Sequence, residues 1–267
     1  MRTYLKRFDS HDDYIEYAES SGFVAPNLSC CSASTTHIHY NMTAPPIVQG
    51  HEYVDLGLPS GTLWATDYIC DSDGHTLFFA WGEVLGYTAD EVWDGDRLFD
   101  WTTYTYANGS DNKLTKYCPT GATEYLDENF SGDSLTELTE TDDVAYTVWG
   151  NRWRTPSTMD FNELLDYTTS SVTYTENEFY LTLTSIENGN KIVFKGKGYA
   201  NGDSVNSYGD LVLCLTREFD MQSPSDAWLL VCAYNGNEDV FFDIDAGNRA
   251  WGFPIRPIIL PPPVTPN

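Results

Sequence analysis

Cysteine and histidine are the residue types in this sequence best suited to nucleophilic, redox or metal chemistry. No two cysteines form a C-x-x-C pair, and their spacing matches no zinc motif. Free, buried thiols in a protein made in a reducing compartment are therefore expected, with Cys214 and Cys232 filling neighbouring strands. The six cysteines are Cys30, Cys31, Cys70, Cys118, Cys214 and Cys232.

The histidines give weak support for a Ser-His-acid site, because four of the five lie in or beside the first 51 residues. The exception is His75, in a D-S-D-G-H turn, where a solvated turn histidine is favoured over a catalytic base. His37 and His39 alternate on one strand, and with Cys30 or Cys31 they would approximate a metal site. Packing of a hairpin or a contact between subunits is the favoured interpretation.

Carboxylates are the most abundant chemical groups, since 40 acidic residues face 14 basic ones and the formal net charge is −26. Clustered carboxylates suit Ca²⁺, but solvated loop acids are the favoured interpretation, so no cofactor is expected and calcium is the minor alternative. This charge repels phosphate, which makes nucleic acids and anionic membranes poor partners. The clusters are Asp71 and Asp73, Asp94 and Asp96, and Asp239, Asp243 and Asp245.

Residues 1–46 are predicted to form a small separate module. Ser10 and Asp13 form a capping box for a helix over about 11–20, and two short strand-like pieces follow at 28–31 and 37–40. One helix and one hairpin cannot bury much apolar surface, so the module is expected to need partner proteins or copies of itself. The start shows no signal peptide, and no apolar stretch is long enough to span a bilayer.

From residue 52 onward the pattern is many short strands separated by polar loops, with few helices. One helix is predicted after Pro156, where Ser157 and Asp160 form a second capping box, and a weaker one over about 141–149. The acidic segment 89–139 looks like a long loop that packs its aromatic side chains, Trp93, Phe99, Trp101 and Tyr104, onto the body. Residues 261–267 are predicted to be an extended, proline-rich tail.

Five blocks resemble, in order and spacing, the C-type-lectin-like domains of gut Bacteroidetes and their phages, which are related to the major paralogous domain of Fibrobacter. The resemblance implies that 47–260 adopts an α+β fold with two helices, a twisted antiparallel sheet and long loops. The sequence departs from the family over 195–217, which leaves the loops there in doubt. The blocks are EYVDLGLPSGTLWAT (52–66), FFAWGE (78–83), LTKYC (114–118), DDVAYTVWGNRWRTPSTMDFNELL (142–165) and GFPIRPI (252–258).

The first module is similar to a segment of structural proteins of crAss-like and other Bacteroidetes-infecting phages, through RFDSHDDYIEYAESSGFVAPNLSCC and the following HIHYN. The resemblance implies attachment to other virion proteins, on capsid or tail. Fibre symmetry then favours a homotrimer. The residues expected to make the attachment are Phe8, Tyr14, Tyr17, Pro26, Asn27, His37, His39 and Tyr40.

Relatives of the lectin-like type bind ligand with late strands and loops, which directs attention to the segment before GFPIRPI. Rigid aromatics mixed with adaptable polar groups suit sugars or proteins, although burial of the tryptophans and an ordinary hairpin turn are the alternatives. The candidate ligand-binding residues are Trp228, Tyr234, Asn235, Asn237, Asp239, Asn248 and Trp251.

Together these features predict a non-enzymatic virion protein, a head or tail-associated fibre that adheres to host-surface glycan or protein. A bacterial cell-surface adhesin is the first alternative. An enzyme of the formylglycine-generating type is the second, but no matching cysteine pair lies near the C-terminus.

Overall fold

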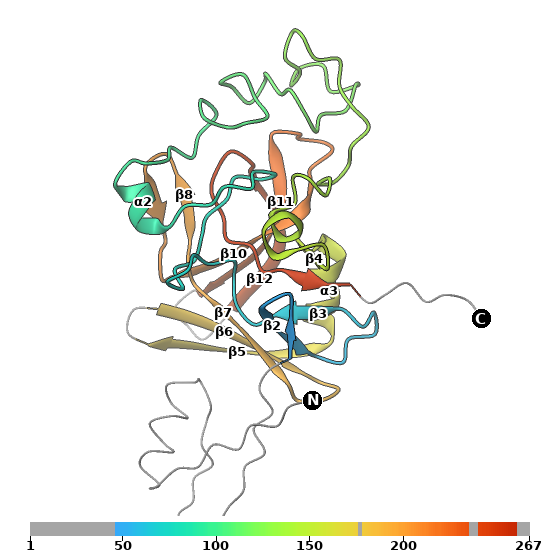
Figure 1. Ribbon diagram of the computed structural model, residues 1–267, viewed down its shortest axis with the longest axis vertical. Helices are drawn as coiled ribbons and strands as arrows, with labels where there is room; N and C mark the ends of the chain where they lie inside the picture. The colour runs from blue at the N-terminus through green and yellow to red at the C-terminus, as the bar shows by residue number, and fades with distance from the viewer. Residues whose placement is uncertain (1–45, 176–177, 235–239, 261–267) are drawn as a thin grey trace, which may run out of the picture. The chain divides into compact units, whose positions relative to one another are not determined.

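The computed structural model describes residues 46–175, 178–234 and 240–260. Its largest sheet is antiparallel, has the order β1-β2-β3-β13-β4, and contains both the first and the last described strand (Figure 1). Gln49 and Gly50 both have positive φ and make the tight β1–β2 turn. The strands are β1 (Ile47–Val48), β2 (His51–Asp55), β3 (Leu63–Ala65), β4 (Trp153–Arg154) and β13 (Ile258–Ile259).

A three-stranded antiparallel sheet, β10-β11-β12, lies at the centre; β10 and β11 are buried on both faces, whereas β12 exposes Asp243 and Asp245. Its strands are nine residues each, β10 (Leu211–Phe219), β11 (Asp226–Tyr234) and β12 (Val240–Asn248). Alternate side chains enter two different cores: Leu213 and Leu229 enter the first, and Leu230 enters the second. Such two-sided burial explains why 211–215 of β10 and 227–233 of β11 read as continuous apolar runs, whereas β12 alternates apolar residues with Asp243 and Asp245.

A second three-stranded sheet, β5-β6-β7, covers the second core together with helix α3 (Thr158–Asp166). Strand β6 alternates strictly between buried and half-buried residues, as expected when one face of a sheet packs on a core. A short ribbon, β8-β9, completes the sheets. The strands are β5 (Thr168–Thr175), β6 (Glu178–Ser185), β7 (Lys191–Lys195), β8 (Tyr199–Asn201) and β9 (Ser204–Asn206).

The predicted α+β fold with two substantial helices is wrong, because the described residues form mainly antiparallel sheets. The helix after Pro156 is confirmed, with its capping box between Ser157 and Asp160, but α3 is only nine residues long. The helix expected over 141–149 is a five-residue π-helical turn, η1 (Ala145–Trp149). The buried Asp143 carboxylate accepts the backbone N–H of Ala145 and of Thr155, which fixes the turn against β4. The turn ends at Gly150, whose φ of +108° lies outside the helical range.

The remaining helix, α2 (Ala89–Trp93), begins at Thr88 with a capping box that the sequence reading missed. The long segment after it, 94–139, forms turns and isolated bridges rather than strands. Phe99, Trp101 and Tyr104 pack into a third core, which confirms that expectation for these three aromatics.

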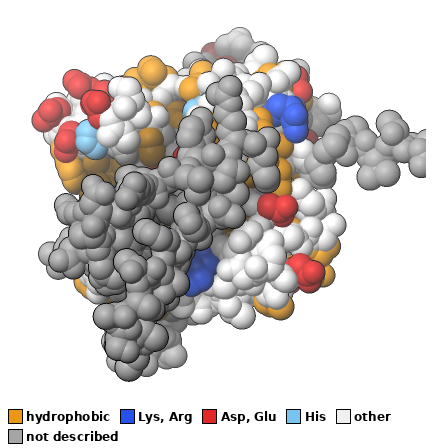
Figure 2. Space-filling model, turned by 60° about the horizontal axis from the view of Figure 1, so that its bottom comes forward, with side chains coloured by type: hydrophobic (Ala, Val, Ile, Leu, Met, Phe, Trp, Pro, Cys, Tyr) orange, Lys and Arg blue, Asp and Glu red, His pale blue; other side chains and the backbone are white. Residues whose placement is uncertain are grey.

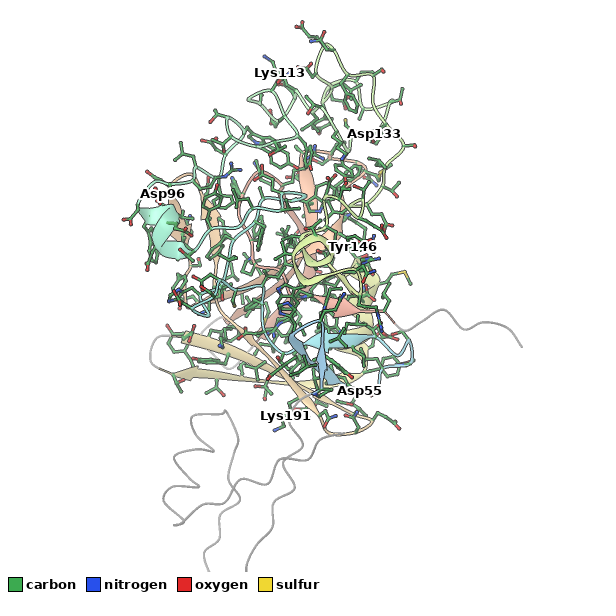
Figure 3. The ribbon with its side chains drawn as sticks, viewed as in Figure 1. Asp55, Asp96, Lys113, Asp133, Tyr146 and Lys191 are labelled. Atoms are coloured by element: carbon green, nitrogen blue, oxygen red, sulfur yellow. The ribbon has the colours of Figure 1, made fainter. Side chains whose placement is uncertain are left out.

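Most of the long segment extends at one end of the described unit (Figure 1). Lys113 and Asp133 lie at that end, whereas Asp55 and Lys191 lie at the other (Figure 3). A search of the described residues found no helix with the length and apolar character needed to cross a membrane.

Candidate ligand-binding site

Of the four described thiols, Cys118, Cys214 and Cys232 are buried, as the sequence predicted, and Cys70 is half-buried; Cys30 and Cys31 lie outside the described residues. Cys214 and Cys232 lie on the neighbouring strands β10 and β11 and are fully buried. Burial raises the pKa of each of these two thiols to about 12 and that of Cys118 to about 11. A nucleophilic cysteine needs a lowered pKa, so these three thiols lack the electrostatic environment of an activated thiol.

His75 is exposed in its turn, as expected. Its Nδ1 lies 3.1 Å from Asp71 Oδ2, and hydrogen bonding to this carboxylate raises the pKa of the imidazole. Asp71 also accepts the backbone N–H groups of Asp73 and His75 through Oδ1, so its carboxylate is engaged in shaping the turn. Figure 2 shows such a grouping of a histidine with acidic side chains on the face it presents.

The three described candidates from the late strands have roles within the fold. Trp228 is half-buried in β11 opposite Ala246. Asn248 accepts the backbone N–H of Ala250 and so shapes a turn. Trp251 stacks on Tyr199, with ring centroids 5.2 Å apart.

The remaining residues predicted to bind ligand do not test that prediction, because the structure describes only the backbone of Tyr234 and none of the others. Tyr234 ends β11, and Asn235, Asn237 and Asp239 lie outside the described residues. The predicted attachment residues lie outside them as well: Phe8, Tyr14, Tyr17, Pro26, Asn27, His37, His39 and Tyr40.

A different pair of aromatic residues has the properties of a binding surface. Trp93, at the end of α2, and Tyr208, in the β9–β10 loop, are 50% and 45% exposed. Their ring centroids lie 5.7 Å apart in an edge-to-face arrangement. The expectation that Trp93 packs onto the body is confirmed only in part: its ring contacts Tyr208, and half of its surface faces solvent. We call Trp93 and Tyr208 the aromatic pair.

The backbone beneath Tyr208 is held by close contacts between two glycine-rich segments. The Gly209 N–H donates to the Gly196 carbonyl at 3.0 Å, and the Gly198 N–H donates to the Leu211 carbonyl at 2.8 Å. Ser207 has φ +51°, a strained conformation for a residue other than glycine. Strain of this kind persists only where neighbouring contacts enforce it, so the loop presents Tyr208 in one defined position.

A partly buried ion pair lies next to the Tyr208 ring. The Lys197 ammonium lies 5.1 Å from the ring centroid and forms a salt bridge with Glu178, which also accepts a hydrogen bond from the Tyr180 hydroxyl. Burial opposes ionisation of Glu178, but the bonds from Lys197 and Tyr180 outweigh it and lower the pKa of the carboxyl. Burial likewise opposes the charge on Lys197, and the bond to Glu178 outweighs it and raises the pKa of the amine.

A third aromatic ring flanks the pair. Tyr174, on β5, is also about half exposed, and its hydroxyl donates to Asp210 Oδ1 at 2.9 Å. Asp210 lies two residues after Tyr208. The site therefore combines exposed ring faces with carboxylates and one ammonium group, drawn from α2, β5 and the β9–β10 loop.

The Glu178–Lys197 pair predicts a defined pH dependence of stability. Because the pKa of Glu178 is lowered, its contribution is complete above the ordinary value of 4.5 and is lost as the pH falls through the lowered pKa. Because the pKa of Lys197 is raised, its contribution is complete below 10.5 and is lost as the pH rises through the raised pKa.

The difference in unfolding free energy between wild type and Glu178→Gln should therefore be constant between about pH 5.5 and 9.5. It should shrink on both sides of that range in urea denaturation curves. A difference that stays unchanged down to about pH 3 would contradict the ion pair.

One signal in the sequence pointed to this site without identifying it. The stretch 195–217, which holds the glycines and Tyr208, is the block that departs from the lectin-like pattern. Tyr208 and Trp93 lie 115 positions apart, as their numbers give by subtraction, so no local pattern brings them together.

The site cannot be interpreted by analogy with known proteins. No family model matches the sequence, and neither a curated protein nor a solved structure matches it. The function therefore has to be argued from the geometry of the aromatic pair and from the resemblances seen in the sequence.

Proposed function

We propose that this chain is a bacteriophage virion protein, a head fibre or tail-associated fibre, that binds host-surface glycan through the aromatic pair. The observation that carries the binding part is the presentation of Trp93 and Tyr208, two half-exposed rings in contact, on a supported backbone. Large rigid rings supply contact area at little entropic cost, which is how protein surfaces recognise sugars and other polar ligands. The virion part rests on the resemblance of residues 1–46 to phage structural proteins.

The charges around the aromatic pair define the class of glycan. Asp210 and Glu178 lie beside Tyr208, in a chain whose net charge is −26. An anionic sugar would meet repulsion from this field, whereas hydroxyl groups of a neutral sugar can donate to the carboxylates. We therefore propose neutral glycans, with apolar sugar faces on the rings and hydroxyl groups towards Asp210.

The arrangement of the unit is compatible with display from a particle. The first and last described strands lie in one sheet, and α2, which carries Trp93, lies well apart from β13 in Figure 1. The proposal requires that the aromatic pair stay exposed to ligand when the part of the chain before residue 46 attaches to a particle. The homotrimer expected from fibre symmetry stays a prediction.

The binding proposal is tested by titrating neutral host-surface polysaccharide into purified protein in a calorimeter. Trp93→Ala and Tyr208→Ala should each weaken binding about tenfold or more, since truncating a central aromatic contact costs roughly 1–2 kcal/mol. Tyr167→Ala is the matched control, because Tyr167 is 46% exposed and lies on another element. Equal affinity in all four proteins would refute the aromatic pair as the site.

The virion proposal is tested separately by cryo-EM of purified phage particles. Density that fits the described unit on capsid or tail is expected. Absence of the chain from particles would overturn the virion proposal and favour a cell-surface adhesin, and it would leave the binding result standing.

A further inference from the structure

Strand β5 is an edge strand without the features that usually prevent edge pairing. It runs for eight residues, TTSSVTYT, with no charged side chain and no proline. Its pairing with β6 is continuous from Thr168↔Ser185 to Thr175↔Glu178, with no bulge. Proteins normally protect long edge strands with charge, proline or a bulge, because unpaired peptide groups are a template for another strand.

The peptide groups that point away from β6 can be identified from the hydrogen bonds of the sheet. The Gly196 N–H donates to the Phe179 carbonyl, so the peptide groups of Phe179 point away from β5, towards β7. Tyr174 pairs with Phe179, and its own peptide groups therefore point away from β6. Because the direction alternates along a strand, Ser170 and Val172 also face away from β6. Among the described residues, no group bonds to the outward peptide groups of Ser170 and Val172.

The opposite edge of the same sheet is closed by buried side chains. On β7, the Val193 carbonyl accepts a hydrogen bond from the buried guanidinium of Arg256. The Lys195 carbonyl accepts one from the Tyr68 hydroxyl at 2.8 Å. Within 46–175, 178–234 and 240–260, side chains therefore satisfy the outward carbonyls of Val193 and Lys195 and leave the outward peptide groups of Ser170 and Val172 unpaired.

We propose that β5 pairs antiparallel with β5 of a second copy of this chain, across a two-fold axis at Ser171. In this register Ser170 of each copy lies opposite Val172 of the other, so their outward peptide groups exchange hydrogen bonds. Thr169 lies opposite Thr173, and such cross-strand threonine pairs are favourable. The result is one continuous six-stranded sheet.

The uncharged strand β5 lets a second copy approach this edge, and TTSSVTYT is complementary to itself in the proposed register. Two chains of charge −26 repel each other, so a contact between copies must use an uncharged stretch, and β5 supplies one. The same stretch offers no charge with which to select a charged partner. Because the area is small, the pairing is weak in solution and is favoured where copies are crowded together, as on a particle.

Sedimentation equilibrium of the full chain under reducing conditions tests the proposal. The average mass should double as concentration rises, and doubling should occur at lower concentration in high salt, which screens the repulsion. Ser170→Pro, which removes an outward N–H, and Ser170→Lys, which adds charge, should each abolish the doubling. Val193→Lys, which adds the same charge at the closed edge, should not.

Cross-linking tests the register itself. In the proposed pairing the two Ser171 Cα atoms lie about 4.5 Å apart, within disulfide range. Ser171→Cys should therefore give a covalent dimer on oxidation, whereas wild type and Val193→Cys should not. A mass independent of concentration, or doubling that survives in both Ser170 variants, would overturn the proposal, and neither result bears on glycan binding.

Discussion

Replacing Arg249 by methionine should lower the free energy of unfolding by about 3 kcal/mol. The Arg249 side chain is fully buried and donates to the carbonyls of Tyr117 and Lys116, both at 2.9 Å. Its guanidinium also lies 5.7 Å from the centroid of the Trp81 ring. Methionine keeps the apolar stem but leaves both carbonyls without these bonds in a buried site, and buried groups left unpaired carry the largest penalties.

Urea denaturation measures this loss, with Lys113→Met as the control. Lys113 is exposed at one end of the described unit (Figure 3), and its replacement should change the free energy of unfolding by less than about 0.5 kcal/mol. Hydrogen exchange should also show faster opening around Lys116 in Arg249→Met, because Arg249 joins the irregular segment to the turn after β12. A stability within about 0.5 kcal/mol of wild type would show that the arginine contributes no net stabilisation.

The second large effect is expected for Gly198→Ala, beneath the aromatic pair. A Cβ atom at this position would overlap the Asn206 carbonyl oxygen and would lie 2.7 Å from the Ser207 carbonyl carbon. The backbone φ of +63° adds a penalty of about 1 kcal/mol for any residue with a Cβ. Relieving the overlap requires the Ser207–Gly209 turn to move, and we expect a loss of about 3 kcal/mol in unfolding free energy.

Gly202→Ala separates the two causes of that loss. Gly202 has a nearly equal φ of +62°, but nothing lies within 4 Å of the position of a Cβ. It should therefore show the backbone penalty alone, and the difference between the variants, about 2 kcal/mol, reports the overlap. The affinity for glycan should fall in Gly198→Ala and stay unchanged in Gly202→Ala. Equal destabilisation of both variants would show that the turn moves freely.

The sequence predicted best those elements that depend on contacts between residues close together in the chain. The capping box at Ser157 and Asp160 is confirmed, because both hydrogen-bond partners lie within four residues of each other. The helix expected over 141–149 is present only as the short turn Ala145–Trp149, which ends at Gly150 with φ +108°. Asp143, at its start, bonds to Thr155, twelve positions away, and that contact is invisible to periodicity. The expected pattern of many short strands with few helices is confirmed, but the sequence did not show how the strands divide among several antiparallel sheets.

The candidate site was missed for the same reason. Its position depends on how glycines at 196 and 198 allow two chain segments to approach, and on an ion pair between Glu178 and Lys197. Neither feature has a pattern at the spacing of a helix or strand. The late strands instead predicted a site that includes Trp228 and Trp251. Both side chains are half-buried within the fold, and Trp251 stacks on Tyr199.

The sheet shared by the first and last described strands also decides how the unit carries mechanical load. A pull on residue 46 acts first on β1, which is held to β2 by only two residue pairs. Strands at the edge of a sheet are peeled one bond at a time, whereas β3 and β13, further inside the sheet, would have to slide past each other with several bonds breaking at once. Under a pull on residue 46, strand β1 should therefore detach from β2 at low force with a short extension, while the cores and the surface that carries Trp93 stay intact.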